Sequence, residues 1–320
     1  MAQFTTTFSS YDALGIREEL SDLISNISPT DTPFQSNIGS EPTGNTFFEW
    51  QNDALAAAAA NAQIEGDDQG NTYTTVTATT RLGNYTQILS KDFLISGTEQ
   101  ALNKAGRADE RGYQAAKKAK EMKRDFELTL FANTAAAAGS DTVARASGGL
   151  TAWSKTNVDS SNTNSVDPVW TSAPTGTRSD GVQRAFTETI LKAVMKLCYD
   201  AGSEPSMLSV GSFNKQEVSA FAGIAALRSD VGGAAATIVG VADVYKSDFG
   251  DLAITPNRFQ RARDGHFISP ELARIRVARP HEIHEMGKTG DADKFLMTFE
   301  AGLQIDNEGG FGLAADLNTS

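Results

Sequence analysis

The longest regular pattern of apolar positions lies between residues 101 and 133. Apolar residues recur there at spacings of three, four and seven, at Ala108, Ala115, Ala119, Met122, Phe126 and Leu130. Such spacing places them on one face of a helix and predicts a helix over residues 107–133. At about 1.5 Å per residue this helix is about 40 Å long, which is longer than most globular domains need. We expect the rest of the chain to be organised around it.

A second pattern, alternation of apolar and polar residues, predicts strands in two parts of the chain. Residues 47–51 alternate, and residues 72–82 are rich in Thr, Val and Tyr, so we expect the two stretches to pair as a long projecting hairpin. Residues 56–60 between them are all alanine, which leaves a helical turn open as an alternative. Near the C-terminus, the period-two apolar face over residues 295–305 is the strongest strand signal in the chain.

The N-terminal part of the chain predicts an arm and a short helix. Apolar residues on one side of residues 14–27 predict an amphipathic helix, which Pro29 and Pro33 end. The segment that follows is extended and has too little local surface to fold alone. Residues 96–99 have the spacing of a capping box and predict a short helix that Gly106 ends.

The second half of the chain begins with a polar stretch. Residues 139–180 are dominated by Ser, Thr, Asn, Gly and Asp, so we expect a long surface loop with two isolated tryptophans, Trp153 and Trp170. The segments after it predict a compact α+β unit. These segments are a helix at 182–201 with Ile190, Val194, Leu197 and Cys198 on one side, a buried strand at 207–211, a helix at 213–221 and a hairpin turning at 248–250. The last part of the chain is β, with an alternating strand at 273–277 before the strand over residues 295–305.

The composition is that of a folded, soluble protein. The 320 residues are 40% hydrophobic, which is enough for one large core or two modest ones. The net charge of −12 argues against general binding to nucleic acid or anionic membranes. The single cysteine excludes an internal disulfide framework and fits a reducing compartment. Without a transmembrane-length apolar run or a signal-peptide pattern, we expect no membrane association and folding in a cytoplasm.

The predicted long helix is basic although the protein is acidic. Residues 107–127 carry seven of the 28 Lys and Arg residues and five of the 40 Asp and Glu residues. A solvated helix face with neighbouring Glu and Lys explains this pattern without a partner. The alternative is a contact with acidic surface on another copy of the chain. The candidate contact residues are Lys117, Lys118, Lys120, Lys123 and Arg124 on the helix and Glu65, Asp67 and Asp68 at the hairpin tip.

The chemical motifs of the chain do not combine into a site. Residues 287–289 imitate the end of a phosphate-binding loop, but Glu282 stands where that loop requires glycine. Residues 310–315 imitate a dinucleotide fingerprint, but too few residues follow them to form the helix it needs. His281 and His284 are one residue short of the zinc-protease spacing. We expect no enzyme activity, no cofactor and no metal.

Seven stretches in order along nearly the whole chain carry a family resemblance. They are SPTDTPF, FEWQNDALAAAAANAQIEG, RLGNYTQI, SGTEQAL, AGRADERGYQAAKKAKEMKRDFE, VYKSDFGDLAITPNR and KTGDADKF. Together they resemble the major capsid (head) proteins of tailed bacteriophages with the Hong Kong 97 type of fold. No single stretch identifies the family, but the seven stretches in this order are specific for it. Residues 139–180 resemble the family least, because such proteins vary there.

The resemblance implies an α+β fold of the Hong Kong 97 type. It implies an N-arm at residues 1–44, an extended loop at 45–87 that lies over the neighbouring subunit, a peripheral domain at 88–181 with the spine helix and a variable insertion at 139–180, an axial domain at 182–265, and closing strands of the peripheral domain at 266–320.

The resemblance also implies a function. The chain is expected to be the major structural protein of an icosahedral head, assembling as hexamers and pentamers around double-stranded DNA that it meets without sequence specificity. Because the chain begins at its arm, we expect scaffolding, if used, to be a separate protein, beside portal and decoration proteins. The expected place is the virion, assembled in the host bacterial cytoplasm. An encapsulin-like cellular shell of the same fold, enclosing a protein cargo, is the alternative.

Overall fold

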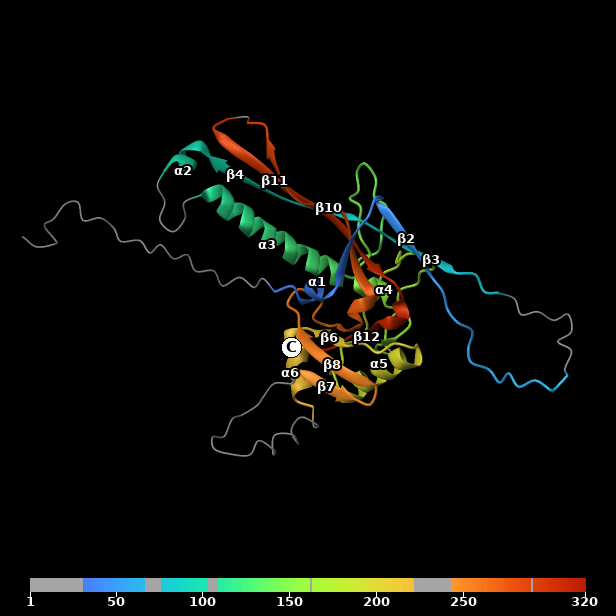
Figure 1. Ribbon diagram of the computed structural model, residues 1–320. Helices are drawn as coiled ribbons and strands as arrows, with labels where there is room; N and C mark the ends of the chain where they lie inside the picture. Colours follow the sequence, from blue (N-terminus) through green and yellow to red (C-terminus); the bar gives the residue numbers. More distant parts are fainter. Residues whose placement is uncertain (1–30, 67–75, 103–108, 162, 222–242, 289) are drawn as a thin grey trace, which may run out of the picture.

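The computed structural model describes residues 31–66, 76–102, 109–161, 163–221, 243–288 and 290–320. These residues form two larger sheets, several helices and a two-stranded hairpin that extends away from both sheets (Figure 1). The mixture of helices and largely antiparallel sheets is the α+β class that the sequence predicts. The expected amphipathic helix at residues 14–27 lies outside the described residues.

The first sheet has four strands in the order β1-β10-β11-β4. Their bounds are Gly39–Pro42 for β1, Ala273–Met286 for β10, Ala292–Ile305 for β11 and Gln87–Ser96 for β4. β1 runs parallel to β10, and the other neighbours are antiparallel. β10 continues well past the predicted end at Val277, and its register shifts on either side of Arg279. Pro280 follows there and cannot donate to the ladder, which is why the pairing is irregular but not broken.

The long helix α3 (Glu110–Phe131) lies along this sheet (Figure 1). Its 22 residues make it about 33 Å long at 1.5 Å per residue. Asp109 caps it, because its carboxylate accepts hydrogen bonds from the backbone N–H groups of Arg111 and Gly112. The helix is thus shorter than the predicted 107–133. Residues 107 and 108 lie outside the described residues, and at the other end Ala132 is already extended.

The apolar face of α3 and the strand β11 confirm the two strongest sequence patterns. Met122, Phe126 and Leu130 of α3 are buried, and Phe126 meets Phe299 of β11 edge-on with ring centroids 5.3 Å apart. From Phe299 onward, however, both faces of β11 are buried. The hairpin covers the second face: a Cβ at Gly302 would lie 2.6 Å from the carbonyl oxygen of Tyr85, so this approach requires glycine.

The second sheet has six short strands in the order β5-β12-β9-β6-β8-β7. Their bounds are Val158–Asp159, Gly312–Ala314, Gly265–Ile268, Met207–Val210, Gly250–Pro256 and Val244–Ser247, in the same order. The helices α5 (Glu188–Asp200) and α6 (Ser212–Ser219) lie beside it (Figure 1). The predicted hairpin is confirmed, since Ser247 pairs with Gly250 across the turn.

The closing segment 266–320, which the resemblance assigns to the peripheral domain, contributes to both sheets. β10 and β11 belong to the first sheet, whereas β12 pairs with β9 in the second sheet and Leu317 is buried in the second core. One expectation about α5 is wrong. On α5, Leu197 was expected to be buried but is 37% exposed. The buried face of α5 instead includes Leu191 and Met195, next to Ile190, Val194 and Cys198.

The expectation that residues 139–180 form a surface loop is also wrong. The segment contains the short helix α4 (Leu150–Trp153), and both Trp153 and Trp170 are buried in the main core. Its small residues serve close packing: a Cβ at Gly149 would lie 2.1 Å from the carbonyl oxygen of Ala132. Polar composition misled the prediction here, because Gly148 and Gly149 mark close contacts with other segments and not exposed turns.

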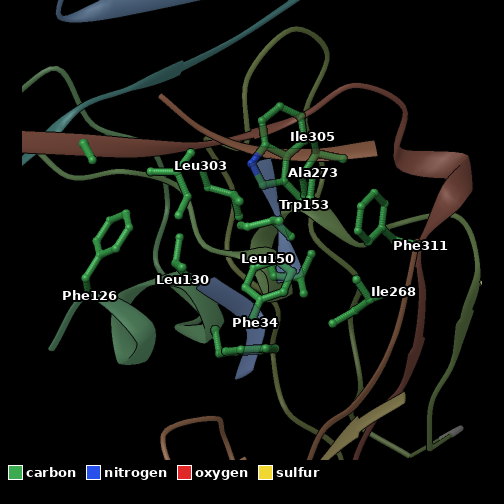
Figure 2. Packing of buried hydrophobic residues seen from close by; sticks show 14 of the residues in the cluster. Phe34, Phe126, Leu130, Leu150, Trp153, Ile268, Ala273, Leu303, Ile305 and Phe311 are labelled. Carbon is green, nitrogen blue, oxygen red and sulfur yellow. The ribbon is translucent and has the colours of Figure 1, made fainter. Parts of the chain in front are cut away.

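The main core lies between the first sheet, α3 and the segment around α4. Figure 2 shows Phe34, Leu150, Trp153, Leu303 and Phe311 pointing into one cluster although they are far apart in the sequence. Phe34 comes from the short helix α1 (Pro33–Asn37) and lies 5.0 Å from the ring of Phe131. The arm predicted for this stretch is therefore anchored in the core by the side chain of Phe34.

The helix α2 (Gly97–Ala101) follows β4 directly. The hydroxyl of Ser96 accepts a hydrogen bond from the backbone N–H of Glu99 at 3.2 Å, as the capping pattern predicts. The helix ends at Ala101 and not at Gly106, which lies outside the described residues. Two three-residue 3-10 helices, Pro270–Leu272 and Glu308–Gly310, complete the described elements.

Candidate assembly interface

The projecting hairpin consists of β2 (Phe47–Asn52) and β3 (Thr80–Tyr85), which pair antiparallel as the sequence predicts. Its base is fixed by Asn84, a fully buried residue of β3. The side-chain amide of Asn84 donates to the carbonyl oxygens of Leu303 at 2.6 Å and Gly148 at 3.2 Å, and its oxygen accepts from the N–H of Gly148 at 2.9 Å. A buried amide with all these partners holds its strand in one position.

Aromatic packing holds the same base from the other strand. The ring of Trp50 in β2 lies 5.6 Å from Trp153, and Trp153 lies 4.9 Å from Trp170. The ammonium of Lys155 lies 3.6 Å from the centroid of the Trp170 ring. All three tryptophans of the chain are therefore in this cluster. Such aromatic contacts contribute about 0.5–1.5 kcal/mol each beyond the area that they bury, so the hairpin leaves the body from a rigid base.

Beyond the paired strands the hairpin loop is exposed. Residues 53–66 form neither helix nor strand, so the helical alternative for the alanine run is wrong. Three large apolar side chains of the loop are almost fully exposed, namely Leu55 at 99%, Ile64 at 81% and Val76 at 90%. The strand predicted over residues 72–82 begins only at Thr80. Glu65 of the acidic tip is exposed, while Asp67 and Asp68 lie outside the described residues.

The basic residues of α3 divide into two groups. Lys117, Lys120 and Lys123 are exposed. Lys118 instead bonds Glu121 at 3.0 Å within the same helix, and its hydrogen bond and charge lower the pKa of Glu121 although burial opposes this. The guanidinium of Arg124 lies 5.4 Å from the centroid of the Phe259 ring. Of the five basic residues that the sequence groups together, three are thus exposed and two are engaged within the subunit.

A buried carboxylate that the sequence did not single out joins α3 to two other segments. Glu127 accepts hydrogen bonds from the backbone N–H groups of Phe34 at 3.0 Å and Gln35 at 3.1 Å, and from the side-chain amide of Asn257 at 2.8 Å. It supplies the cap that α1 lacks, because the side chain of Thr32 makes no capping bond. Only the position of Glu127 beside the apolar stripe could have indicated burial, and that signal is weak.

The residues considered for chemistry have structural roles. His266 is fully buried, and burial lowers its pKa to about 3. The ring of His281 stacks on Phe299 with centroids 4.0 Å apart. Burial raises the pKa of the Cys198 thiol to about 12. No cluster of three or more potential metal ligands exists in the part of the chain that the structure describes, and no helix within it is long and apolar enough to cross a membrane.

A projecting hairpin, a long helix and two sheets together point to a family of proteins that assemble. The family model for the SU10 major capsid protein matches residues 1–318. The chain belongs to this family. The major capsid protein of Escherichia phage Phieco32 is 41% identical to this capsid protein over 133 residues. That match covers 41% of this chain and 37% of the length of the Phieco32 protein.

Solved structures share the fold of this capsid protein at low sequence identity. A chain of the Cyanophage A-1(L) capsid has a TM-score of 0.68 at 11% identity and covers 95% of this chain and 98% of its own. A chain of Mycobacterium phage Bobi has a TM-score of 0.62 at 10% identity, with coverage of 94% and 95%. The capsid of a native GTA particle has a TM-score of 0.62 at 12% identity, with coverage of 97% and 98%.

These likenesses confirm the Hong Kong 97 type of fold that the sequence resemblance implies. The family is one of structural capsid proteins. The relatives are phage and particle capsids and not encapsulins, so they favour the head protein over the cellular shell.

Proposed function

We propose that this capsid protein builds an icosahedral head shell from hexamers and pentamers of itself, around the double-stranded DNA of a tailed phage. The single observation that supports subunit contact most strongly is the exposed hairpin loop. Leu55, Ile64 and Val76 are each at least 81% exposed, which is unusual for three large apolar side chains that lie between the same two paired strands. A neighbouring copy that lies under the loop would cover them, and burial of each would contribute about 1.5–3 kcal/mol.

Charge complementarity supports the same contact. The acidic tip with Glu65, Asp67 and Asp68 and the exposed face of α3 with Lys117, Lys120 and Lys123 have opposite charge. We propose that the tip of one subunit meets the helix face of a neighbour. Each exposed pair is worth only about 0–1 kcal/mol, but a closed shell repeats it in every subunit. The competing explanations are a solvated helix face, and a face turned toward packaged DNA that is bound without sequence specificity.

The division into domains is part of the proposal. The four-stranded sheet with α3 would be the peripheral domain, the six-stranded sheet with α5 and α6 the axial domain, residues 1–44 the N-arm, and residues 45–87 the extended loop. Residues 139–180 would vary between relatives at their surface positions only, because the core positions are packed. Scaffolding, portal and decoration proteins would be separate chains. The protein would act in the virion without enzyme activity, after assembly in the host bacterial cytoplasm.

Negative-stain microscopy of the expressed chain tests this function, combined with absorbance spectra of particles purified from infected cells. We expect closed shells of the expressed chain, and particles from infection with the spectrum of DNA. Shells that carry a protein cargo and no nucleic acid would support the encapsulin alternative. A chain that stays monomeric under all conditions in which relatives form particles would contradict the proposal.

A further inference from the structure

The joint between the hairpin and the first sheet is a single residue. β3 ends at Tyr85 and β4 begins at Gln87, so only Thr86 separates the strand of the hairpin from the strand of the sheet. Thr86 is fully buried. Because two strands that share a one-residue joint change direction only through its backbone angles, the conformation of Thr86 determines the angle at which the hairpin leaves the sheet.

Every polar group of Thr86 has a partner on a different part of the chain. Its N–H donates to the carbonyl oxygen of Thr46, next to the start of β2, at 2.9 Å. Its hydroxyl donates to Oε1 of Glu300 in β11 at 2.7 Å. Its carbonyl oxygen accepts a hydrogen bond from Nε of Arg145 at 2.7 Å. The joint is therefore held by the hairpin, by the sheet and by the segment that precedes α4.

Glu300 is the centre of these contacts, and we call the set of Thr86, Glu300 and Arg145 the clamp. It is 6% exposed and pairs with two guanidinium groups, that of Arg145 at Oε1 and that of Arg279, whose Nε lies 2.8 Å from Oε2. Burial opposes the charge of Glu300, but the hydrogen bonds of Thr86 and Arg279 and the charge of Arg145 outweigh it and lower its pKa. An ionised carboxylate with charge-assisted bonds on both oxygens is held more strongly than one with neutral hydrogen bonds.

A small change of angle at the clamp would move the far end of the hairpin by several ångströms. From Thr86 to Val76 the chain spans ten residues, or about 33 Å when extended, so a rotation of about 10° at the joint moves the far end by about 6 Å. A displacement of that size would change which residues of a neighbour meet the loop. Interfaces that repeat by symmetry convert a changed contact angle into a changed curvature of the whole assembly.

We propose that the clamp of Thr86, Glu300 and Arg145 sets the angle of the hairpin and thereby the curvature of the shell. Glu300 is a positioning residue, because it acts on the neighbour only through Thr86. The effect on shell curvature rests on the proposed function, since it requires the hairpin to lie on a neighbouring subunit. The effect on the hairpin angle concerns the subunit alone and is tested separately.

The shell test compares conservative variants with matched controls. Thr86→Val keeps the shape but removes the hydroxyl, and Glu300→Gln removes the charge. Thr86→Ser keeps the hydroxyl, and Lys246→Gln removes an exposed charge on β7 of the second sheet, outside the clamp. We expect folded subunits for all four by circular dichroism. Cryo-electron microscopy should then show one shell diameter for wild type and both controls, and shifted or mixed diameters or open sheets for Thr86→Val and Glu300→Gln.

The subunit test measures the hairpin angle without assembly. Spin labels on Gln51→Cys in β2 and Asp92→Cys in β4 report the distance between hairpin and sheet by pulsed electron paramagnetic resonance. We expect the Thr86→Val background to broaden or shift the distance distribution relative to wild type and Thr86→Ser. An unchanged distribution, or unchanged shell diameters in both Thr86→Val and Glu300→Gln, would overturn the inference. Failure of wild-type subunits to form shells at all would count against the proposed function and leave the distance measurement decisive for the clamp.

Discussion

The side-chain amide of Asn257 donates a hydrogen bond to Oε1 of Glu127 at 2.8 Å, and both side chains are buried. Asn257 follows β8 of the second sheet, and Glu127 belongs to the helix that covers the first sheet. The same carboxylate holds the N-terminal helix α1 through two backbone N–H groups. One residue of α3 therefore joins three segments that lie far apart in the sequence, and the two sheets share it as a point of contact.

Glu127→Ala is expected to destabilise the subunit. The substitution leaves two backbone donors and one amide donor without their acceptor, and such losses typically cost about 1–3 kcal/mol each. Because part of that cost is relieved by water, we expect a loss of about 2–4 kcal/mol in the free energy of unfolding, measured with urea. Glu121→Ala on the same helix removes a partly exposed pair and should cost about 0–1 kcal/mol. Equal losses for the two variants would contradict the role assigned to Glu127.

Asp264 is expected to make stability depend on pH. Burial raises its pKa from 3.8 to about 6, although Arg261 opposes this. The folded subunit therefore holds a proton that the unfolded chain releases, and the stability linked to that proton is present below about pH 4 and lost as the pH rises to about 6. His266 beside it stays neutral over this range, because its pKa is lowered to about 3.

Asp264→Asn tests this dependence, since asparagine stays neutral at every pH. We expect the melting temperature of the variant, relative to wild type, to rise between about pH 3.5 and about pH 7, by the equivalent of up to about 3 kcal/mol. Asp251→Asn on the exposed side of β8 is the control and should show no such trend. A constant difference across the range would mean that Asp264 does not gain a proton on folding.

The segment 139–180 is expected to behave as part of the core around its tryptophans. Trp153→Ala removes a fully buried indole and should cost about 3–5 kcal/mol. Val169→Ala, at a position that is 82% exposed, should change stability by less than about 0.5 kcal/mol. Hydrogen exchange should be slow at residues 152–154, whose backbone N–H groups donate to the carbonyl oxygens of Gly149 and Leu150, and faster at residues 140–143. Fast exchange throughout the segment would support the loop expected from composition.

The basic face of α3 is expected to affect assembly and not folding. Lys117→Glu with Lys120→Glu reverses two exposed charges, so the melting temperature of the unassembled subunit should stay nearly unchanged. Assembly followed by light scattering without DNA should weaken and lose part of its salt sensitivity. Lys118→Gln is the control, because that ammonium is engaged with Glu121 in its own helix. If the double variant assembles normally and its only defect is poor retention of DNA, this face contacts the packaged genome and not a neighbouring subunit.

Periodic patterns predicted the fold where one face of an element is buried. The stripe of Met122, Phe126 and Leu130 on α3 is such a case. The alternation from Phe295 to Ile305 also predicts the correct element, although only its first part has one face that is less buried than the other. The alternation predicts the strand but not the burial of both its faces after Phe299. That burial depends on the hairpin, which returns from more than 200 residues earlier in the chain, and no local pattern records such a contact.

Composition was a poorer guide than periodicity. Gly149 and its small neighbours indicate a loop by composition, yet they allow a helix end to pack closely. Buried polar residues such as Asn84 and Glu300 are equally hidden from sequence, because their burial depends on partners from distant segments. The basic residues of α3 could be identified from the sequence, but their division into exposed and engaged groups required the positions of Glu121 and Phe259.

Electron microscopy of a chain that lacks residues 56–71 tests the central claim most directly. The deletion removes most of the hairpin loop beyond the paired strands β2 and β3 and leaves the clamp at Thr86 and the tryptophan cluster in place. We expect soluble subunits or small oligomers with circular dichroism like that of wild type, and no closed shells, because the neighbour loses its contact with the loop. Normal closed shells formed by the deleted chain would contradict the claim that this hairpin holds subunits together.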